Sequence, residues 1–107
     1  MSSWTLGASS AAEEPPQKGI VAIDLTIDGG DPLTLSTVEA VRLETALGNA
    51  LTGFDDVFGR ISCVNVGVQI VIAVDKTAIA ALVYSKAELM RSQLKELLAG
   101  NGTEFTG

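Results

Sequence analysis

Hydrophobic and polar residues alternate along residues 19–27, GIVAIDLTI. One side of this segment carries four aliphatic residues, Val21, Ile23, Leu25 and Ile27. An alternation with a period of two residues predicts a β-strand with one buried face. The run DGGDP, residues 28–32, has the composition of a turn, so we expect the strand to end there.

A pattern with the period of a helix begins at Ser36. The string STVE, residues 36–39, is a capping box, in which the side chains of Ser36 and Glu39 each bond a free backbone N–H at the start of a helix. The apolar stripe that follows includes three alanines among its seven residues: Ala40, Leu43, Ala46, Leu47, Ala50, Leu51 and Phe54. We therefore expect a helix that packs closely on a sheet and stops at Gly53.

Aliphatic residues occupy every second position from Val64 to Val74. A single strand from Arg60 to Val74 would span about 50 Å, whereas a domain of this length has a radius of gyration of about 13 Å. We therefore predict a hairpin that folds at Gly67, because a type II turn requires a positive φ at that position. One long strand bent by a bulge at Gly67 is the alternative.

The predicted hairpin has a two-residue loop, which sets its register. Across it, Asn65 opposes Val68, Cys63 opposes Ile70, and Ile61 opposes Ile72. The core face then carries Ile61, Cys63, Val68, Ile70, Ile72 and Val74, and the other face carries Arg60, Ser62, Val64, Gln69, Val71 and Ala73. Because the second face still holds Val64, Val71 and Ala73, it is suited to contact with another molecule.

The C-terminal part of the chain has the composition of a helix. Asp75 is a suitable N-cap for a short helix to about Val83, and SKAE, residues 85–88, is a second capping box for a longer helix that ends at Gly100. One kinked helix is the alternative. The closing NGTEFTG is compatible with a short edge strand through Thr103–Phe105 or with a frayed end.

Residues 1–18 are rich in Ser, Ala, Glu, Pro and Gln, and predict a disordered N-terminal tail ahead of a single domain, residues 19–107. Trp4 stands out in this tail as a large apolar residue. One interpretation is a flexible terminus, and the other is a docking anchor for a partner, since tryptophan is common at binding hot spots.

The expected order of elements is strand, helix, strand, strand, helix (β-α-β-β-α). This order predicts the α+β class, with a two-layer sandwich in which both helices cover one face of an antiparallel, ferredoxin-like sheet. The length of 107 residues fits one domain with a single core.

Charge and composition narrow the classes of function. Seven basic and thirteen acidic residues give a net charge of −6, which repels phosphate backbones and anionic lipid. We expect neither nucleic-acid binding nor insertion into a membrane. Histidine is absent and Cys63 is the only cysteine, so neither a Ser-His nor a Cys-His nucleophile can form within the chain. The sequence predicts no catalytic residue, cofactor or metal site, and it leaves the localisation unknown.

Several residues of types found in functional sites have ordinary structural roles as their better interpretation. The acidic residues Asp24, Asp28, Asp31, Asp55 and Asp56 match no calcium-loop spacing and are interpreted as solvated turn residues. Gly29 and Gly30 lack a phosphate-binding string, and Cys63 is interpreted as a buried structural thiol. Asn101 begins an N-glycosylation acceptor triplet, which matters only for an extracellular domain.

The pattern also resembles the SEA domain family. The residues that carry the likeness are VAIDLTI, ETALGNALTG and ISCVNVGVQIVIAVD, followed by a helix rich in Ala and Leu, over residues 19–100. The resemblance implies a ferredoxin-like α+β module in a surface or adhesion protein. Self-cleavage between a hairpin glycine and a serine is not implied, because Val68 follows Gly67 here.

The function expected from the sequence is a non-catalytic module for protein–protein interaction or assembly, with a protein partner or a second copy. Its expected interaction surface consists of Trp4, Val64, Val71 and Ala73. The alternative is a small-molecule-binding regulatory domain, with its ligand at a dimer interface near the DGGDP turn, residues 28–32.

Overall fold

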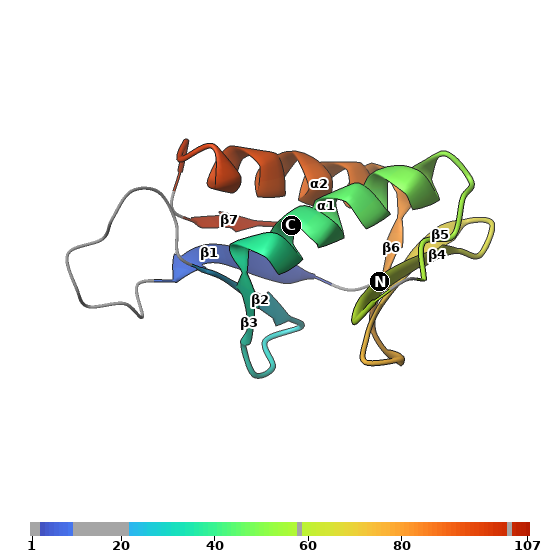
Figure 1. Cartoon of the computed structure of the whole chain (residues 1–107), viewed down its shortest axis with the longest axis horizontal. Helices are drawn as coiled ribbons and strands as arrows, with labels where there is room; N and C mark the ends of the chain where they lie inside the picture. Colours follow the sequence, from blue (N-terminus) through green and yellow to red (C-terminus); the bar gives the residue numbers. More distant parts are fainter. Residues whose placement is uncertain (1–2, 10–21, 58, 103) are drawn as a thin grey trace.

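The protein is an α+β sandwich of two layers, with two helices above two antiparallel sheets (Figure 1). This computed structural model describes residues 3–9, 22–57, 59–102 and 104–107. The predicted α+β class is confirmed, but the strands form two sheets instead of one. The radius of gyration is 13.1 Å, as expected for one compact unit of this length.

Nine elements make up the described chain: β1 (Trp4–Ser9), β2 (Ala22–Ile27), β3 (Leu33–Ser36), α1 (Thr37–Leu51), β4 (Ile61–Asn65), β5 (Gln69–Val74), β6 (Thr77–Val83), α2 (Tyr84–Leu98) and β7 (Glu104–Thr106). The first sheet has the strand order β3-β2-β1-β7, and the second has the order β4-β5-β6. We call them the four-stranded and the three-stranded sheet. The two helices pack on each other and cover the same side of both sheets (Figure 1).

A single aliphatic core lies between the helix layer and the sheets. The alternating residues Ile23, Leu25 and Leu35 of the four-stranded sheet are buried, as are Ile61, Cys63, Ile70, Ile72 and Leu82 of the three-stranded sheet. Helix α1 contributes Ala40, Leu43, Ala46, Leu47 and Ala50 to the same core. The predicted inward faces of residues 21–27 and of the hairpin strands are therefore confirmed wherever the structure describes them.

Helix α1 begins as predicted. Ser36 is its N-cap, and the Ser36 hydroxyl accepts a hydrogen bond from the Glu39 N–H at 3.1 Å. The Glu39 carboxylate accepts one from the Ser36 N–H at 3.2 Å, which completes the capping box. The helix ends at Leu51, close to the predicted stop at Gly53, whose φ is +98°.

The prediction of an N-terminal tail is wrong for residues Trp4–Ser9, which form β1. This strand pairs with β2 on one side and with β7 on the other, so it lies inside the four-stranded sheet. Trp4 and Leu6 alternate into the core, and both are buried. The alternation contains only two large apolar residues, Trp4 and Leu6, and the polar composition of the residues that follow them favours a tail over a strand. The remainder of the predicted tail, residues 10–18, lies outside the described residues.

The hairpin at Gly67 is confirmed, but its predicted register is wrong. Asn65 pairs with Ile70, Cys63 with Ile72, and Ile61 with Val74. The Val66 N–H donates to the Gln69 carbonyl at 2.9 Å, so the two loop residues are Gly67 and Val68, one position later than predicted. The Asn65 side chain also accepts a hydrogen bond from the Gly67 N–H at 2.8 Å, as in an Asx turn. Each partner moves by two positions, so the residues within the two strands keep their predicted faces. Two residues outside the strands do not. Val68 lies in the loop, and Arg60, expected on the outer face, precedes β4 and bonds Glu39 of α1 and Asp75.

The short helix expected after Asp75 is instead the strand β6, Thr77–Val83. Asp75 and Lys76 both have positive φ, +53° and +68°, which is the backbone of a two-residue type I′ hairpin loop. β6 therefore folds back onto β5. The predicted break near Tyr84 is correct, since α2 begins there, but Val83 is its N-cap and the second capping box is not used.

The expected C-terminal edge strand is present as β7, one residue further along than predicted. It pairs antiparallel with β1 at the edge of the four-stranded sheet.

Candidate functional site

The outer face of the three-stranded sheet, opposite the helices, is aliphatic. A row of Val64, Val71 and Ala81 crosses β4, β5 and β6 at the same level of the register. Ala73 and Val83 extend the row, and all five side chains are partly exposed. The other members of this face, Ser62, Gln69 and Ala78, are uncharged. We call these eight residues the aliphatic face. It contains Val64, Val71 and Ala73, three of the four residues expected to form an interaction surface.

The outer face of the four-stranded sheet has the opposite character. Its exposed or partly exposed side chains include Thr5, Asp24, Thr26, Thr34 and Glu104. The Thr34 hydroxyl donates a hydrogen bond to the Asp24 carboxylate at 2.8 Å. Polar and acidic groups of this kind are well solvated. The two sheets therefore present a polar and an aliphatic surface on the same side of one molecule.

Trp4, the fourth expected interaction residue, is a core residue and belongs to no exposed surface. Only 3 % of it is exposed, and its indole N–H donates to the Gln93 side-chain oxygen at 2.8 Å. The Gln93 amide in turn donates to the Thr106 carbonyl at 2.8 Å. This chain of hydrogen bonds ties β1, α2 and β7 together. The prediction of a docking anchor at Trp4 is wrong, because its position in a strand turns the ring inward.

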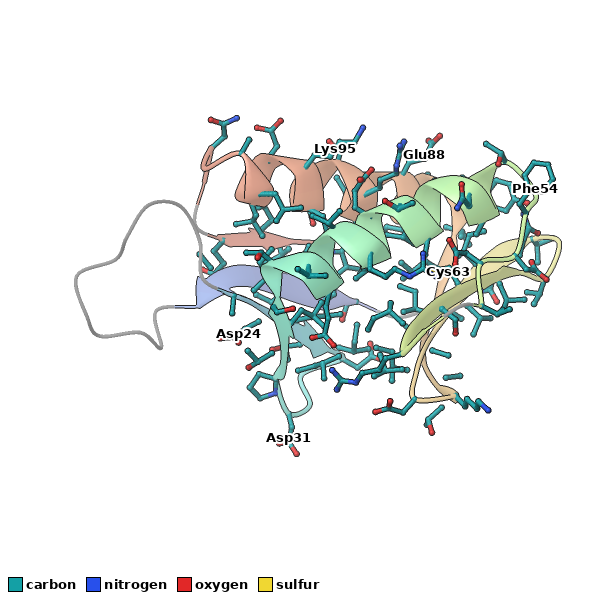
Figure 2. The ribbon with its side chains drawn as sticks, in the orientation of Figure 1. Asp24, Asp31, Phe54, Cys63, Glu88 and Lys95 are labelled. Atoms are coloured by element: carbon teal, nitrogen blue, oxygen red, sulfur yellow. The ribbon has the colours of Figure 1, made fainter. Side chains whose placement is uncertain are left out.

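Sequence reasoning missed an exposed apolar cluster at one end of the molecule. Phe54 and Val68 are 71 % and 78 % exposed, although each was expected on a core face. Figure 2 shows Phe54 beyond the end of α1, next to the β4–β5 loop. Asn65 joins the segments here, since its side chain donates to the Ala50 carbonyl at 2.8 Å and to the Tyr84 hydroxyl at 2.6 Å. The sequence signal for this exposure is a glycine before each residue. Gly53 follows the end of α1, so Phe54 lies outside the helix, and Gly67 follows the end of β4, so Val68 lies in the loop.

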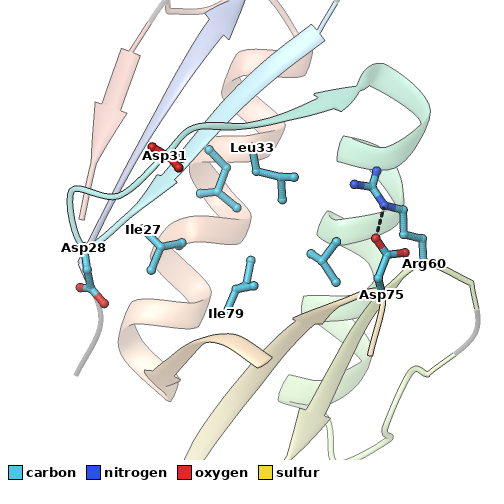
Figure 3. Close-up of a pocket in the computed structure, with 9 residues that line it drawn as sticks. Ile27, Asp28, Asp31, Leu33, Arg60, Asp75 and Ile79 are labelled. Atoms are coloured by element: carbon cyan, nitrogen blue, oxygen red, sulfur yellow. Dashed lines mark hydrogen bonds and ion pairs between the residues drawn. The ribbon is translucent and has the colours of Figure 1, made fainter. Parts of the chain in front are cut away.

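A groove with a volume of about 490 Å³ lies between the two sheets on the side away from the helices. Leu25, Ile27 and Leu33 line it from the four-stranded sheet, and Val74 and Ile79 line it from the three-stranded sheet. Figure 3 shows Ile27, Leu33 and Ile79 directed into the space between the sheets. The polar lining residues are Asp28, Asp31, Arg60 and Asp75.

Arg60 closes one end of this groove and connects two elements. Its guanidinium donates to the Glu39 carboxylate at 2.7 Å. It also donates to the Asp75 carboxylate at 3.2 Å (Figure 3). The hydrogen bond to Glu39, followed by the one to Asp75, raises the pKa of Arg60 above its already high ordinary value. The arginine charge at this end is thus already balanced by two carboxylates.

Cys63 is buried below α1, as predicted (Figure 2). Loss of solvent, aided by the nearby Asp56 charge and opposed by Arg42, raises the pKa of the Cys63 thiol to about 12. A protonated, enclosed thiol is a poor nucleophile and a poor metal ligand. The geometry therefore assigns Cys63 to packing.

The acidic residues weighed in the sequence lie in different places. Asp28 accepts a hydrogen bond from the Ser3 N–H at 2.8 Å, and Asp55 accepts one from the Asn65 N–H at 2.9 Å. Asp56 is buried and accepts from both terminal nitrogens of Arg42 and from the Asn49 side chain, which holds the α1–β4 connection. Asp24 and Asp31 lie on the outer sheet face and at the β2–β3 turn.

Among the residues that the structure describes, no group of three or more carboxylate, thiol or imidazole side chains is placed to hold a metal ion. None of the helices formed by these residues has the length and apolarity needed to cross a membrane. Asn101 is exposed in the turn that follows α2.

Comparison with protein-family models, with curated proteins and with solved structures finds no match to this chain.

Proposed function

We propose that this protein is a non-catalytic interaction module that pairs through its aliphatic face, with a second copy of the chain as the partner. The observation that carries this proposal is the contrast between the two outer sheet surfaces. One holds threonines and carboxylates, whereas the other holds valines and alanines and no ionisable group. An aliphatic, uncharged sheet face is suited to sheet-on-sheet packing against the same face of another copy.

Charge supports the choice of this face. Two copies with a net charge of −6 each repel one another at long range. The repulsion is smallest where the approaching surfaces carry no charges, and interface centres are depleted in charged residues. The aliphatic face meets this condition, because its polar members are a serine and a glutamine. An isologous pair requires that the same patch on each copy complement itself, which an uncharged aliphatic surface can do.

The test is a lysine substitution at the centre of the aliphatic face. Val71 lies between Val64 and Ala81, so Val71→Lys puts a charge in the middle of the contact while the lysine stem still reaches water in a monomer. We expect wild type to show concentration-dependent dimerisation in sedimentation equilibrium. The variant should be monomeric, with an unchanged circular dichroism spectrum.

The matched control is Thr26→Lys, on the polar outer face of the four-stranded sheet. It changes the net charge by the same amount at a strand position of similar exposure. We expect this variant to dimerise like wild type. A wild-type protein that stays monomeric at millimolar concentration would overturn the proposal, as would equal dimerisation of the two lysine variants.

A second function, binding of a small molecule for regulation, is favoured by one observation. The 490 Å³ groove is lined by Asp28 and Asp31 of the DGGDP turn, where a ligand was expected from the sequence. Pockets for small molecules are commonly concave and mostly apolar, with a few polar groups that fix orientation. The groove has this composition, and a saturable effect of a bound small molecule on self-association would support the regulatory role.

A further inference from the structure

We infer that the groove between the two sheets binds an amphipathic organic cation, a molecule with an aliphatic body and a protonated amine. This inference rests on the small-molecule function proposed above, and it is independent of pairing through the aliphatic face. Neither the fold class nor the composition of the chain specifies this class of ligand. Three properties of the groove lead to it: its volume, its walls and its charges.

The volume and walls specify the aliphatic body. A space of about 490 Å³ lies within the range of about 300–1,000 Å³ that is usual for small-molecule sites. The helices bury Ile23, Leu25 and Leu35 of the four-stranded sheet. In contrast, Ile27, Leu33 and Ile79 are only partly buried and are directed into the groove (Figure 3). An aliphatic chain placed between them would remove this remaining apolar surface from water, which is favourable in proportion to its area.

The charges specify a cation. Asp28 and Asp31 line the groove on the side of the β2–β3 turn, and Asp31 is exposed. An ammonium group near these carboxylates gains a direct attraction, and the net charge of −6 adds a long-range one. The single cation in the lining is Arg60, which already donates to Glu39 and Asp75. A carboxylate or phosphate ligand would compete with both bonds and meet the repulsion of the aspartates.

The experiment uses three probes with the same aliphatic chain: octylamine, octanol and octanoate. Each is titrated into the labelled full-length protein at neutral pH and low salt, and amide resonances are followed by NMR. We expect octylamine to give saturable shifts at Asp31, Leu33 and Ile79, with weaker affinity in high salt. Octanol should bind the same residues more weakly, and octanoate should bind the weakest.

Charge-matched variants separate a specific site from general attraction to an acidic protein. Asp31→Asn removes one negative charge at the groove, and Glu88→Gln removes one from the exposed surface of α2, in the opposite layer (Figure 2). We expect Asp31→Asn to weaken octylamine about two- to fivefold, the range for an exposed ion pair, and to leave octanol unchanged. Glu88→Gln should change neither affinity.

Ile79→Thr tests the apolar wall, since threonine keeps the β-branched shape of a strand residue. It should weaken octylamine and octanol alike. The inference is overturned if octanoate binds as tightly as octylamine, if the saturable shifts lie away from the groove, or if Asp31→Asn and Glu88→Gln have equal effects. If none of the three probes binds, the ligand site is overturned, but the proposal of dimerisation through the aliphatic face is unaffected. Binding without any change in self-association supports the site and overturns only its regulatory role.

Discussion

The role of the Cys63 side chain is determined by its surroundings. Cys63 has no exposed surface, and it lies in a strand that pairs with both β5 and the backbone of Asp56. Desolvation is the main reason that the pKa of its thiol rises to about 12. The residue type alone is compatible with catalysis, metal binding or packing. Burial in an aliphatic core selects packing, because the charged thiolate is not formed there at physiological pH.

The raised pKa of Cys63 predicts a pH dependence of stability. The native thiol keeps its proton up to about pH 12, whereas the unfolded thiol releases it near pH 9.0. The native state therefore binds more protons than the unfolded state in this window, and the free energy of unfolding falls as the pH rises, by at most about 1.4 kcal/mol per pH unit. Below the unfolded pKa this contribution is fully present.

Cys63→Ala isolates this effect, since it removes the thiol and leaves every other titrating group. We expect the stability difference between wild type and variant, measured by urea unfolding, to shrink between neutral pH and about pH 10. The small cavity shifts the variant by a constant amount at all pH values, so only the change with pH is diagnostic. Parallel pH profiles of the two proteins would contradict the assignment.

At the scale of secondary structure, β6 shows where local patterns are ambiguous. TAIAALV, residues 77–83, has three alanines and one leucine, which favour a helix, and Asp75, which could cap a helix, lies two residues before it. Ala80 and Leu82 also alternate with partly exposed neighbours, which is a strand pattern. Pairing with β5 decides between them, since β5 would otherwise lack a neighbour on that side. Tertiary hydrogen bonds here override local helix propensity.

The loop that makes this hairpin predicts a stabilising substitution. Lys76 has a φ of +68°, a conformation that costs an L-residue about 1–2 kcal/mol and costs glycine almost nothing. Part of the gain is lost to the greater freedom of glycine in the unfolded chain, so we expect Lys76→Gly to stabilise the protein by about 0.5–1 kcal/mol. Thermal and urea unfolding measure the change.

Lys76→Ala is the matched control for the loop. It removes the same charge and the same side-chain stem but keeps a Cβ atom in the left-handed conformation. No comparable gain is expected from it. If alanine stabilised the protein as much as glycine, the benefit would come from removing lysine and the backbone argument would fail.

At the scale of the whole molecule, the N-terminal strand holds the four-stranded sheet together. β1 lies between β2 and β7, and Gly107 and Trp4 exchange backbone hydrogen bonds at 3.0 and 3.1 Å. The two ends of the chain are thus joined in one sheet. Because Trp4 also bonds Gln93 of α2, loss of β1 would open the sheet and the layer above it.

Deleting residues 1–9 therefore should prevent folding. The deletion removes Trp4 and Leu6 from the core, and each truncation costs about 2–5 kcal/mol, which together approaches the 5–15 kcal/mol stability of a typical domain. Circular dichroism and cooperative urea unfolding report the loss. Ser3→Ala serves as a control at the exposed end of the segment and should fold normally. A cooperatively folded deletion variant would show that the segment is dispensable.

The sequence by itself determined the elements whose signals are local. The capping box at Ser36, the alternation of β2 and the reversal at Gly67 each depend on residues a few positions apart, and each is present in the structure. Burial of Cys63 and the aliphatic character of Val64 and Val71 also follow from the period of a strand. The sequence therefore indicated which face of these strands is aliphatic and partly exposed.

Only the tertiary structure decided what depends on distant partners. It placed Trp4 in a strand against Gln93, added β3 and β6 as neighbours of predicted strands, and separated the strands into two sheets. That separation creates the groove, whose walls come from residues about fifty positions apart in the chain, such as Ile27 and Ile79. No local pattern encodes such a space. It exists because pairing energies between remote strands, rather than residue preferences, determine which sheet edges meet.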